Sequence, residues 1–363
     1  MLVPTVICIE DLAAGAAQGD LLNADGSVRV PLLVVDLDQP AGGDTVLRRA
    51  EQQAAQCDRL LVGLTRRVVP PAGHPAHAAS PLLGALDLTL TPTGTADRRT
   101  VPVGDPEKVA QVLGHAAADN PEAAIILGRL LRTGPRLTVG QALDAESLAY
   151  STLLAGRGFA RWLAARGHRP PPPPAPAAPV LLARDGEVLR VTLNRPERHN
   201  AYGRELRDAL VAALDVALLD DSVGHVVLSG NGPSFCSGGD LGEFGVATAL
   251  DTAHLIRTQG GAALPLHRLR DRVTVRVHGN CIGAGIELPA FASRIVADPS
   301  ALFRLPELGM GLIPGAGGTV SIPRRVGRWR TLYLVLTGCR LTAERALRWG
   351  LVDELGPVAP SGP

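Results

Sequence analysis

A proline-rich run, RPPPPPAPAAP at residues 169–179, constrains the fold of this chain more than any other sequence feature. Proline fixes the backbone φ angle and has no N–H group, so the run cannot form a helix or a central strand. Such a segment is extended and semi-rigid, with a rise of about 3 Å per residue. We therefore expect a linker between an N-terminal region, 1–168, and a C-terminal region, 180–363. A proline-rich docking motif is the alternative interpretation.

The composition argues against several classes of protein. Lys and Arg number 36 against 35 for Asp and Glu, and aromatic residues make up 3%, so no nucleic-acid-binding groove is expected. The sequence has no apolar run of about 18 residues and no basic start of a signal peptide, so we expect neither a membrane partner nor secretion. Five scattered cysteines without CxxC spacing indicate neither a disulfide framework nor a zinc site, and they favour a cytoplasmic protein. Cys236 and Cys281 are expected to be packing residues rather than nucleophiles.

The N-terminal region has the pattern of an α/β module. Apolar runs at 30–37 and 60–64 have strand length, and the residues between them, 44–56, favour a helix, so the two strands are expected to be parallel. Further helices are expected at 105–118, at 121–132 and over the amphipathic stretch 145–166. No set of residues in this region converges as catalysis requires, and His74 and His77 are expected to be solvated loop residues.

The C-terminal region has a different pattern of strands and helices. Short apolar runs at 180–182 and 188–193 flank the turn sequence Asp185-Gly186, which predicts a hairpin. A helix is expected over 202–219, and strands are expected over 225–229 and 273–277. Alternating strands and helices indicate an α/β layer arrangement.

Four stretches of the C-terminal region carry the residues with chemical potential. They are LNRPERHNAY (193–202), SFCSGGDL (234–241), GNCIGAGIEL (279–288) and FRLPELGMGLIPGAGGT (303–319). A glycine pair such as that in the second stretch usually marks only a tight turn. Glu287 is harder to explain by structure alone, because it lies between Ile286 and Leu288 and its carboxylate would be partly desolvated. A buried ion pair is the alternative interpretation.

In their order and spacing, the four stretches resemble the crotonase (enoyl-CoA hydratase/isomerase) family over residues 180–355. The resemblance implies a crotonase-like ββα spiral core. It also implies that two backbone N–H groups, those of Gly239 and Ala284, hold the thioester carbonyl of an acyl-CoA. Such donors stabilise the enolate charge that develops on the thioester oxygen. Gly238 would let the backbone approach the ligand, and the helix opened by Ala284 would add its positive end.

The resemblance assigns the acid–base chemistry to two carboxylates. Glu287 would bind and activate water, and Glu307 would be the principal proton donor at the α-carbon. The implied reaction is the reversible hydration of a 2-enoyl-CoA to a 3-hydroxyacyl-CoA, by a lyase that needs no metal or redox cofactor. The alternatives are another reaction of the family (double-bond isomerisation, decarboxylation or thioester hydrolysis) and a non-catalytic acyl-CoA-binding subunit.

Other residues of these stretches fall where the family contacts its substrate. Arg198 and Ala201 match positions near the nucleotide end of CoA, although an exposed arginine is as often simply solvated. Asp240 and Leu241 are expected to line the acyl and pantetheine path. The sequence does not indicate the chain length or chemical character of the acyl group.

The chain departs from the family pattern at its C-terminal end. In the family, the stretch corresponding to Gly350–Glu354 is followed by several helices that cover the acyl pocket and build a trimer, but this sequence ends at Pro363. Residues 145–166 resemble that terminal helical region. We therefore expect the N-terminal region to be a degenerate crotonase-like half whose helices cover the pocket of the C-terminal region. A homo-oligomer is still expected.

Arg304 is a second departure, since a small residue is common at this position in the family. If its side chain points inward, it would lower the pKa of the nearby Glu307 or bind a carboxylate of the substrate. If its side chain points outward, it has no role in the site.

Overall fold

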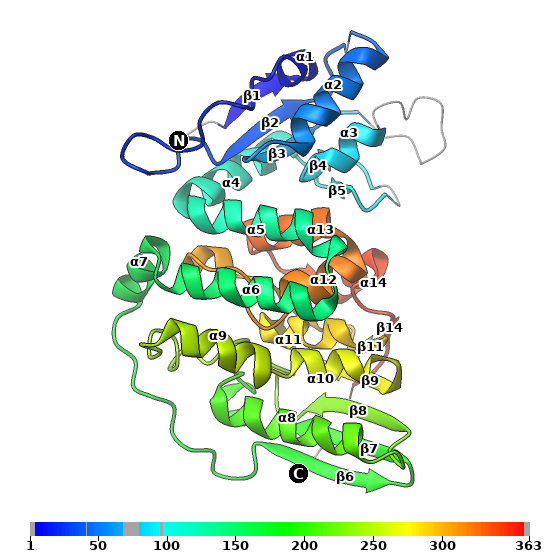
Figure 1. The fold of residues 1–363 in the computed structure, drawn as a ribbon. Helices are drawn as coiled ribbons and strands as arrows, with labels where there is room; N and C mark the ends of the chain where they lie inside the picture. The colour runs from blue at the N-terminus through cyan, green and yellow to red at the C-terminus, as the bar shows by residue number, and fades with distance from the viewer. Residues whose placement is uncertain (1–3, 41, 68–79, 95–96, 359–363) are drawn as a thin grey trace. The chain divides into compact units, whose positions relative to one another are not determined.

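The computed structural model describes residues 4–40, 42–67, 80–94 and 97–358. His74 and His77 lie outside these residues. The chain divides into two compact units (Figure 1). Unit 1 contains Met1–Thr133 and Val326–Thr337, and unit 2 contains Gly134–Arg325 and Gly338–Pro363. The expected boundary at the proline-rich run does not coincide with this division, because residues 134–168 belong to unit 2.

Unit 1 is built on a parallel sheet of five strands. The strands follow one another across the sheet in chain order: β1 (Thr5–Cys8), β2 (Leu32–Asp36), β3 (Leu60–Leu64), β4 (Leu88–Thr91) and β5 (Thr100–Pro102). All four neighbouring pairs are parallel. The three central strands are almost entirely buried, as expected for a parallel sheet covered on both faces. The expected parallel pair formed by β2 and β3, with the helix α2 (Asp44–Ala55) between them in sequence, is confirmed.

The other helices of unit 1 begin at recognisable signals. α4 (Pro106–Asp119) starts with a proline, and the Asp105 carboxylate before it accepts a hydrogen bond from the Lys108 N–H. The other helices of this unit are α1 (Ile9–Ala13), α3 (Ser80–Ala85), α5 (Pro121–Thr133) and α13 (Arg328–Thr337). All of α13 belongs to unit 1 although it lies late in the sequence, and it packs against α4, α5 and β4.

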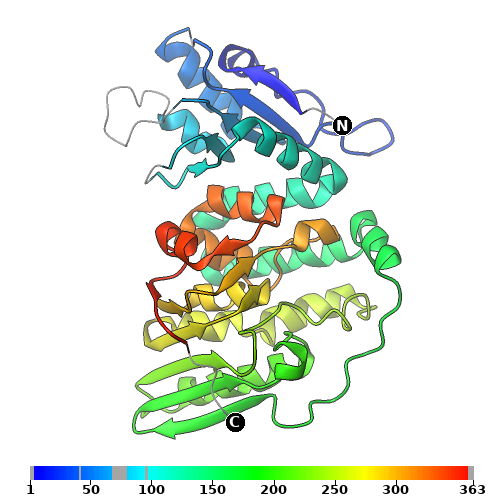
Figure 2. The same ribbon diagram turned by 180° about the vertical axis from the view of Figure 1, so that it is seen from behind.

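Unit 2 has a six-stranded sheet and a separate three-stranded sheet (Figure 2). In spatial order the larger sheet contains β14 (Glu354–Leu355), β11 (Arg294–Ala297), β9 (Val273–Val277), β8 (His225–Gly230), β7 (Val188–Leu193) and β6 (Val180–Asp185). The expected hairpin is confirmed, because β6 and β7 are antiparallel, whereas the other pairs are parallel. The smaller sheet contains β10 (Asn280–Ile282), β12 (Leu302–Arg304) and β13 (Leu341–Thr342).

The helices of unit 2 include two that precede the proline-rich run. The expected amphipathic stretch forms α6 (Val139–Leu154) and α7 (Arg157–Arg166), and α6 runs alongside α9 (Figure 1). The others are α8 (Arg204–Leu219), α9 (Leu250–Gln259), α10 (Ala263–Arg268), α11 (Ala284–Glu287), α12 (Gly318–Val326) and α14 (Ala343–Trp349). Short 3₁₀ helices are η1 (Gly134–Arg136), η2 (Pro196–Arg198), η3 (Arg270–Arg272), η4 (Pro289–Phe291) and η5 (Glu307–Met310).

The proline-rich run is extended, as expected, and forms no helix or strand between α7 and β6 (Figure 2). It is fixed to unit 2 by polar contacts. The Ala175 N–H donates to the Glu205 carboxylate, and the Arg195 guanidinium donates to the Pro173 carbonyl, both at 3.0 Å.

Within the described residues, no helix is long and apolar enough to cross a membrane. The same residues contain no group of three or more His, Cys, Asp or Glu side chains arranged to hold a metal ion. All five cysteines are free thiols, and Cys236 and Cys281 are buried.

Candidate active site

Two segments that carry the expected main-chain donors lie side by side in unit 2. Cys236 and Cys281 form a parallel bridge, in which the Ile282 N–H donates to the Cys236 carbonyl at 3.0 Å. Three residues further along each segment are Gly239 and Ala284. The register of the bridge therefore brings the two expected donor residues to the same region.

The N–H groups of Gly239 and Ala284 donate to no acceptor in the part of the chain that the structure describes. Around Gly239, the Tyr202 N–H donates to the Gly238 carbonyl at 2.7 Å and the Asp240 N–H donates to the Tyr202 carbonyl at 3.4 Å. These bonds leave the amide between them unengaged. Ala284 is the first residue of α11, where a helical N–H has no partner within the helix. The site thus has two main-chain donors available for a ligand.

Gly283 marks the point on which both expected carboxylates converge. Its φ angle is +50°, and a Cβ atom placed there would lie 2.7 Å from Glu307 Oε1 and 3.6 Å from Glu287 Oε1. The same position is 3.7 Å from the Cα atom of Gly238. Glu287, Glu307 and the first donor segment therefore surround one space, which any side chain at residue 283 would fill.

Glu287 is held firmly and is 2% exposed. Its Oε2 atom accepts hydrogen bonds from the Ala316 N–H at 2.8 Å and the Gly318 N–H at 2.9 Å. Burial raises the pKa of Glu287 well above its usual range, and the charges of Glu307 and Glu146 act in the same direction. The two N–H donors oppose this shift, because they stabilise the ionised form.

Glu307 has a different environment. Its residue surface is half-buried, but its Oε2 atom is buried and has no hydrogen-bond partner among the described residues. Burial raises the pKa of Glu307 to about 8, and the charge of Glu146 adds to the shift. The Glu307 N–H and the charge of Arg304 oppose this shift, because they stabilise the ionised form.

Two residues of α6 that no sequence motif singles out, Glu146 and Tyr150, also lie at this site. Glu146 is 2% exposed and accepts hydrogen bonds from Gly317 and Thr319. Tyr150 packs against Gly315, and its ring would lie 2.4 Å from a Cβ atom placed there. The available signal was their spacing of four residues, which puts both on one face of an amphipathic helix. Within residues 145–166, Glu146 and Tyr150 thus contact the same segment that holds Glu287, as the expected covering of the pocket requires.

Comparison with known proteins identifies the family. Residues 183–360 match the family described as enoyl-CoA hydratase/isomerase. Over 178 residues the chain is 36% identical to 2,3-dehydroadipyl-CoA hydratase of Escherichia coli (strain K12). The matched region covers 49% of this chain and 69% of that protein. The chain belongs to the enoyl-CoA hydratase/isomerase family. Proteins of this family bind acyl-CoA and are mostly enzymes such as hydratases and isomerases.

Other relatives of the enoyl-CoA hydratase/isomerase family match the same half of the chain. A probable mitochondrial enoyl-CoA hydratase of Dictyostelium discoideum is 34% identical over 173 residues, covering 48% of this chain and 62% of that protein. Among solved structures, an enoyl-CoA hydratase of Mycobacterium smegmatis has 33% identity and a TM-score of 0.46, covering 51% of this chain and 71% of that one.

Two of the four residues expected to contact the substrate, Arg198 and Asp240, bind each other in the structure. The Arg198 guanidinium forms a two-point ion pair with the Asp240 carboxylate, with distances of 2.7 and 2.9 Å. Asp240 is 3% exposed. Its carboxylate accepts hydrogen bonds from Arg198 and from the Gly242 N–H, so it is not available to a ligand. Ala201 is half-buried and Leu241 is 36% exposed, so both have surface available to a ligand.

Three further side chains near the site, those of Arg304, Cys236 and Cys281, have contacts or burial that indicate structural roles. Arg304 is exposed, and its Nε atom donates to the Gly338 carbonyl at 2.7 Å, so its side chain points away from the space around Gly283, although its charge still opposes the rise in the pKa of Glu307. Burial raises the pKa of Cys236 to about 12 and also raises the pKa of Cys281. Both thiols are therefore poor nucleophiles, consistent with packing roles.

Proposed function

We propose that this protein catalyses the reversible addition of water to a 2-enoyl-CoA, giving a 3-hydroxyacyl-CoA. The observation that carries the proposal is the convergence of Glu287 and Glu307 on Gly283, next to the donor segments of Gly239 and Ala284. Hydration of a conjugated double bond needs both the pair of carboxyl groups and the pair of N–H donors. A base activates water at the β-carbon, an acid protonates the α-carbon, and two donors hold the charge on the thioester oxygen between these events.

In this mechanism the unengaged N–H groups of Gly239 and Ala284 bind the thioester oxygen. Attack of water at the β-carbon moves electrons toward that oxygen, and two preorganised donors stabilise the resulting enolate. The loss of one such donor typically costs about 3 kcal/mol in activation free energy. The helix α11 contributes little further field, because it contains only four residues.

The hydrogen bonds around the two carboxyl groups support a division of roles. Glu287 accepts two N–H donors, which stabilise its ionised form, so it is the base that takes a proton from water. Glu307 Oε2 has no partner among the described residues, so we assign the proton of the pair to Glu307, although burial raises the pKa of Glu287 well above its usual range as well. With its pKa raised by burial to about 8, Glu307 is protonated at neutral pH and can act as the proton donor.

This assignment gives a bell-shaped pH profile for hydration. The rate falls as pH rises through about 8, because Glu307 loses the proton that it must donate. It also falls on the acid side as Glu287 becomes protonated and can no longer act as a base. A profile without the alkaline limb would contradict the role of Glu307.

The test is the loss of enoyl absorbance when purified protein is mixed with crotonyl-CoA. We expect Glu287→Gln and Glu307→Gln each to lower kcat about a hundred- to ten-thousand-fold, the usual contribution of acid–base catalysis. Glu344→Gln, at an exposed position on α14, is the matched control and should leave turnover unchanged. Turnover that is insensitive to both substitutions would contradict the assignment. Binding of the acyl-CoA without turnover would favour a non-catalytic subunit.

We also propose that the N-terminal region, 1–168, is a degenerate crotonase-like half. The five strands of unit 1, all within this region, are parallel and follow chain order, as do β7, β8, β9, β11 and β14 of unit 2, which supports a common origin. An experimental structure in which unit 1 does not superpose on that part of unit 2 would contradict it. Assembly into a homo-oligomer stays a prediction, to be measured by light scattering of the purified protein.

A further inference from the structure

Unit 2 contains a third buried carboxylate that the proposed mechanism does not use. It belongs to Glu146 of α6, which precedes the family segment 183–360. The residue is 2% exposed, and no ion pair neutralises it within the described residues. A charged or protonated group in such a place needs a compensating set of contacts.

Glu146 receives three hydrogen bonds from the segment 316–319. Its Oε1 atom accepts the Gly317 N–H at 2.7 Å. Its Oε2 atom accepts the Thr319 N–H at 2.8 Å and the Thr319 hydroxyl at 2.6 Å. Glu146 is thus bound to the loop and the first turn of α12 at every second residue.

Glu287 binds the same segment at the intervening residues. Its Oε2 atom accepts the N–H groups of Ala316 and Gly318. The two carboxylates therefore alternate along four consecutive amides, and neither can move without changing the direction of the amides that the other uses. Because Glu287 Oε2 is fixed in this way, its Oε1 atom is left facing the space around Gly283.

We propose that Glu146 is a positioning residue for Glu287, supplied by a helix outside the family segment, which fixes the amides that hold the base. The inference rests on the proposed function, since it takes Glu287 to be the base. Glu146 does not touch the substrate in this scheme. It acts through the segment 316–319 and through its charge.

The charged and titratable groups around Glu146 come from four elements. They are Tyr150 on α6, Arg257 on α9, Glu287 on α11 and Glu307 on η5. Burial raises the pKa of Glu146 to about 7, while its hydrogen bonds and the Arg257 charge oppose the shift. When Glu146 is ionised, its charge raises the pKa of Glu287, so removal of that charge should lower the pKa of the base.

Two substitutions separate the effect of position from the effect of charge. Glu146→Asp keeps the charge but retracts the carboxylate from the segment 316–319, so kcat should fall about tenfold with the acid limb of the pH profile unchanged. Glu146→Gln removes the charge and keeps the length of the side chain, but its NH2 group cannot accept one of the two N–H donors, so kcat should fall and the acid limb should also move to lower pH. The KM for crotonyl-CoA should change less than about twofold in both. Asp144→Asn, on the same helix but exposed, is the matched control and should resemble the wild type.

A second measurement does not depend on turnover. Infrared titration of the substrate-free protein follows the carbonyl band of protonated carboxyl groups, and Glu287→Gln identifies the band of Glu287. We expect that band to titrate at lower pH in Glu146→Gln than in the wild type or Asp144→Asn.

The outcomes are distinguishable. If the wild type does not turn over crotonyl-CoA, the proposed function fails, but the infrared titration still tests the coupling between Glu146 and Glu287. If both variants of Glu146 lower only the melting temperature, with the acid limb and the infrared titration unchanged, Glu146 is a structural brace and the inference is wrong.

Discussion

Buried carboxylates in the two units of this protein differ in whether they form ion pairs with arginine side chains. In unit 1, Asp87 is 1% exposed, and its carboxylate forms ion pairs with the guanidinium groups of Arg132 and Arg328. The Leu61 N–H adds a third donor at 2.8 Å. In unit 2, Glu287 and Glu307 have no ion pair within the described residues, and burial raises the pKa of both.

The contrast teaches that burial alone does not identify a functional acid. Asp87 is paired with cations, as a buried charge must be in a purely structural role. Glu287 and Glu307 are buried beside each other without an ion pair among the described residues, and the charge of Arg304 only partly offsets the rise in the pKa of Glu307, so the pair can keep a proton that it exchanges. An arrangement of this kind is unfavourable for stability, and it is typical of catalytic sites.

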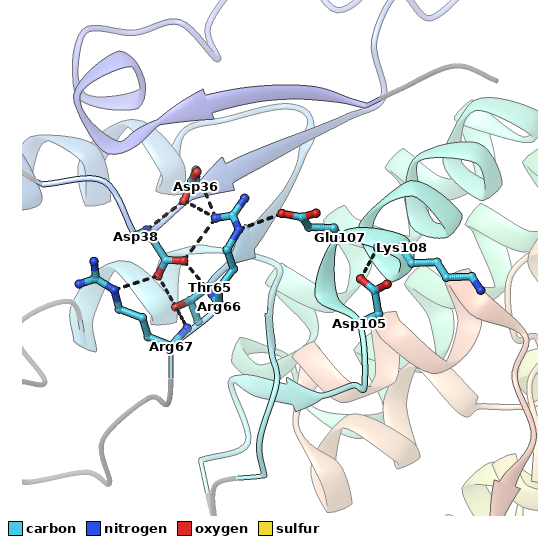
Figure 3. Close-up of polar contacts among 8 residues, drawn as sticks. All are labelled: Asp36, Asp38, Thr65, Arg66, Arg67, Asp105, Glu107 and Lys108. Carbon is cyan, nitrogen blue, oxygen red and sulfur yellow. Dashed lines mark hydrogen bonds and ion pairs between the residues drawn. The ribbon is translucent and has the colours of Figure 1, made fainter.

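A third arrangement lies at the carboxyl ends of β2 and β3 in unit 1 (Figure 3). Arg66 forms ion pairs with Asp36 and Asp38 at 3.3 Å and with Glu107 at 2.8 Å. The Arg66 side chain is 50% exposed, so water screens these charges. The cluster is therefore solvated. Although burial acts to raise the pKa of Asp38, hydrogen bonds from Thr65 and Arg66 lower it, whereas burial raises the pKa values of Glu287 and Glu307.

The largest expected effect concerns the space shared by the two proposed catalytic carboxyl groups, Glu287 and Glu307. Gly283→Ala would place a methyl group 2.7 Å from Glu307 Oε1 at a φ of +50°, so one of the carboxylates must move. We expect kcat/KM for crotonyl-CoA to fall roughly a thousandfold, since acid–base catalysis is lost. Gly309→Ala, where a Cβ meets nothing within 4 Å, is the control. Equal activities of the two variants would show that the carboxylates do not converge at Gly283.

The next effect concerns the compensated acid of unit 1. Asp87→Asn leaves Arg132 and Arg328 buried without their counter-ion, and we expect the free energy of unfolding to fall by about 3 kcal/mol. The comparison is Asp58→Asn, because Asp58 pairs with Arg129 but is 67% exposed. That variant should lose less than about 1 kcal/mol. Chemical denaturation measures both, and similar losses would remove the distinction between buried and exposed pairs.

The uncompensated acids of unit 2 should make the stability of the protein depend on pH. Glu307 has a raised pKa in the folded state, so its contribution is fully present below its unfolded pKa and is lost as pH rises through about 8. We expect the free energy of unfolding to decrease by on the order of 2 kcal/mol between pH 5 and pH 8. Glu307→Gln should flatten this slope, whereas Glu122→Gln, at an exposed position on α5, should not. An unchanged slope in Glu307→Gln would refute the raised pKa.

The smallest expected effect concerns the exposed cluster. Arg66→Ala removes three ion pairs at once, but each is screened by water, so the free energy of unfolding should change by about 1 kcal/mol or less. The melting temperature at low and high salt measures this change, which should shrink further as salt is added. A loss as large as that of Asp87→Asn would mean that the cluster is structurally essential.

The sequence by itself determined the local structure and the two catalytic candidates. The strands β3 and β9 begin and end where the apolar runs predicted them, because a buried strand needs a short continuous apolar run bounded by turns. The glycine-rich stretches and the buried position of Glu287 were also readable, because they depend on neighbours in the chain. No such pattern predicted β1, β4 or β5, which are very short.

Only the tertiary structure decided what surrounds those residues. Glu146 meets Gly317 across 171 residues of sequence, and no local pattern indicates which buried face will receive a distant helix. The Arg198–Asp240 ion pair and the outward direction of Arg304 were likewise open in the sequence. The physical reason is that hydrogen bonds and charges act over a few ångströms in space, so their partners are set by packing between elements and not by order along the chain.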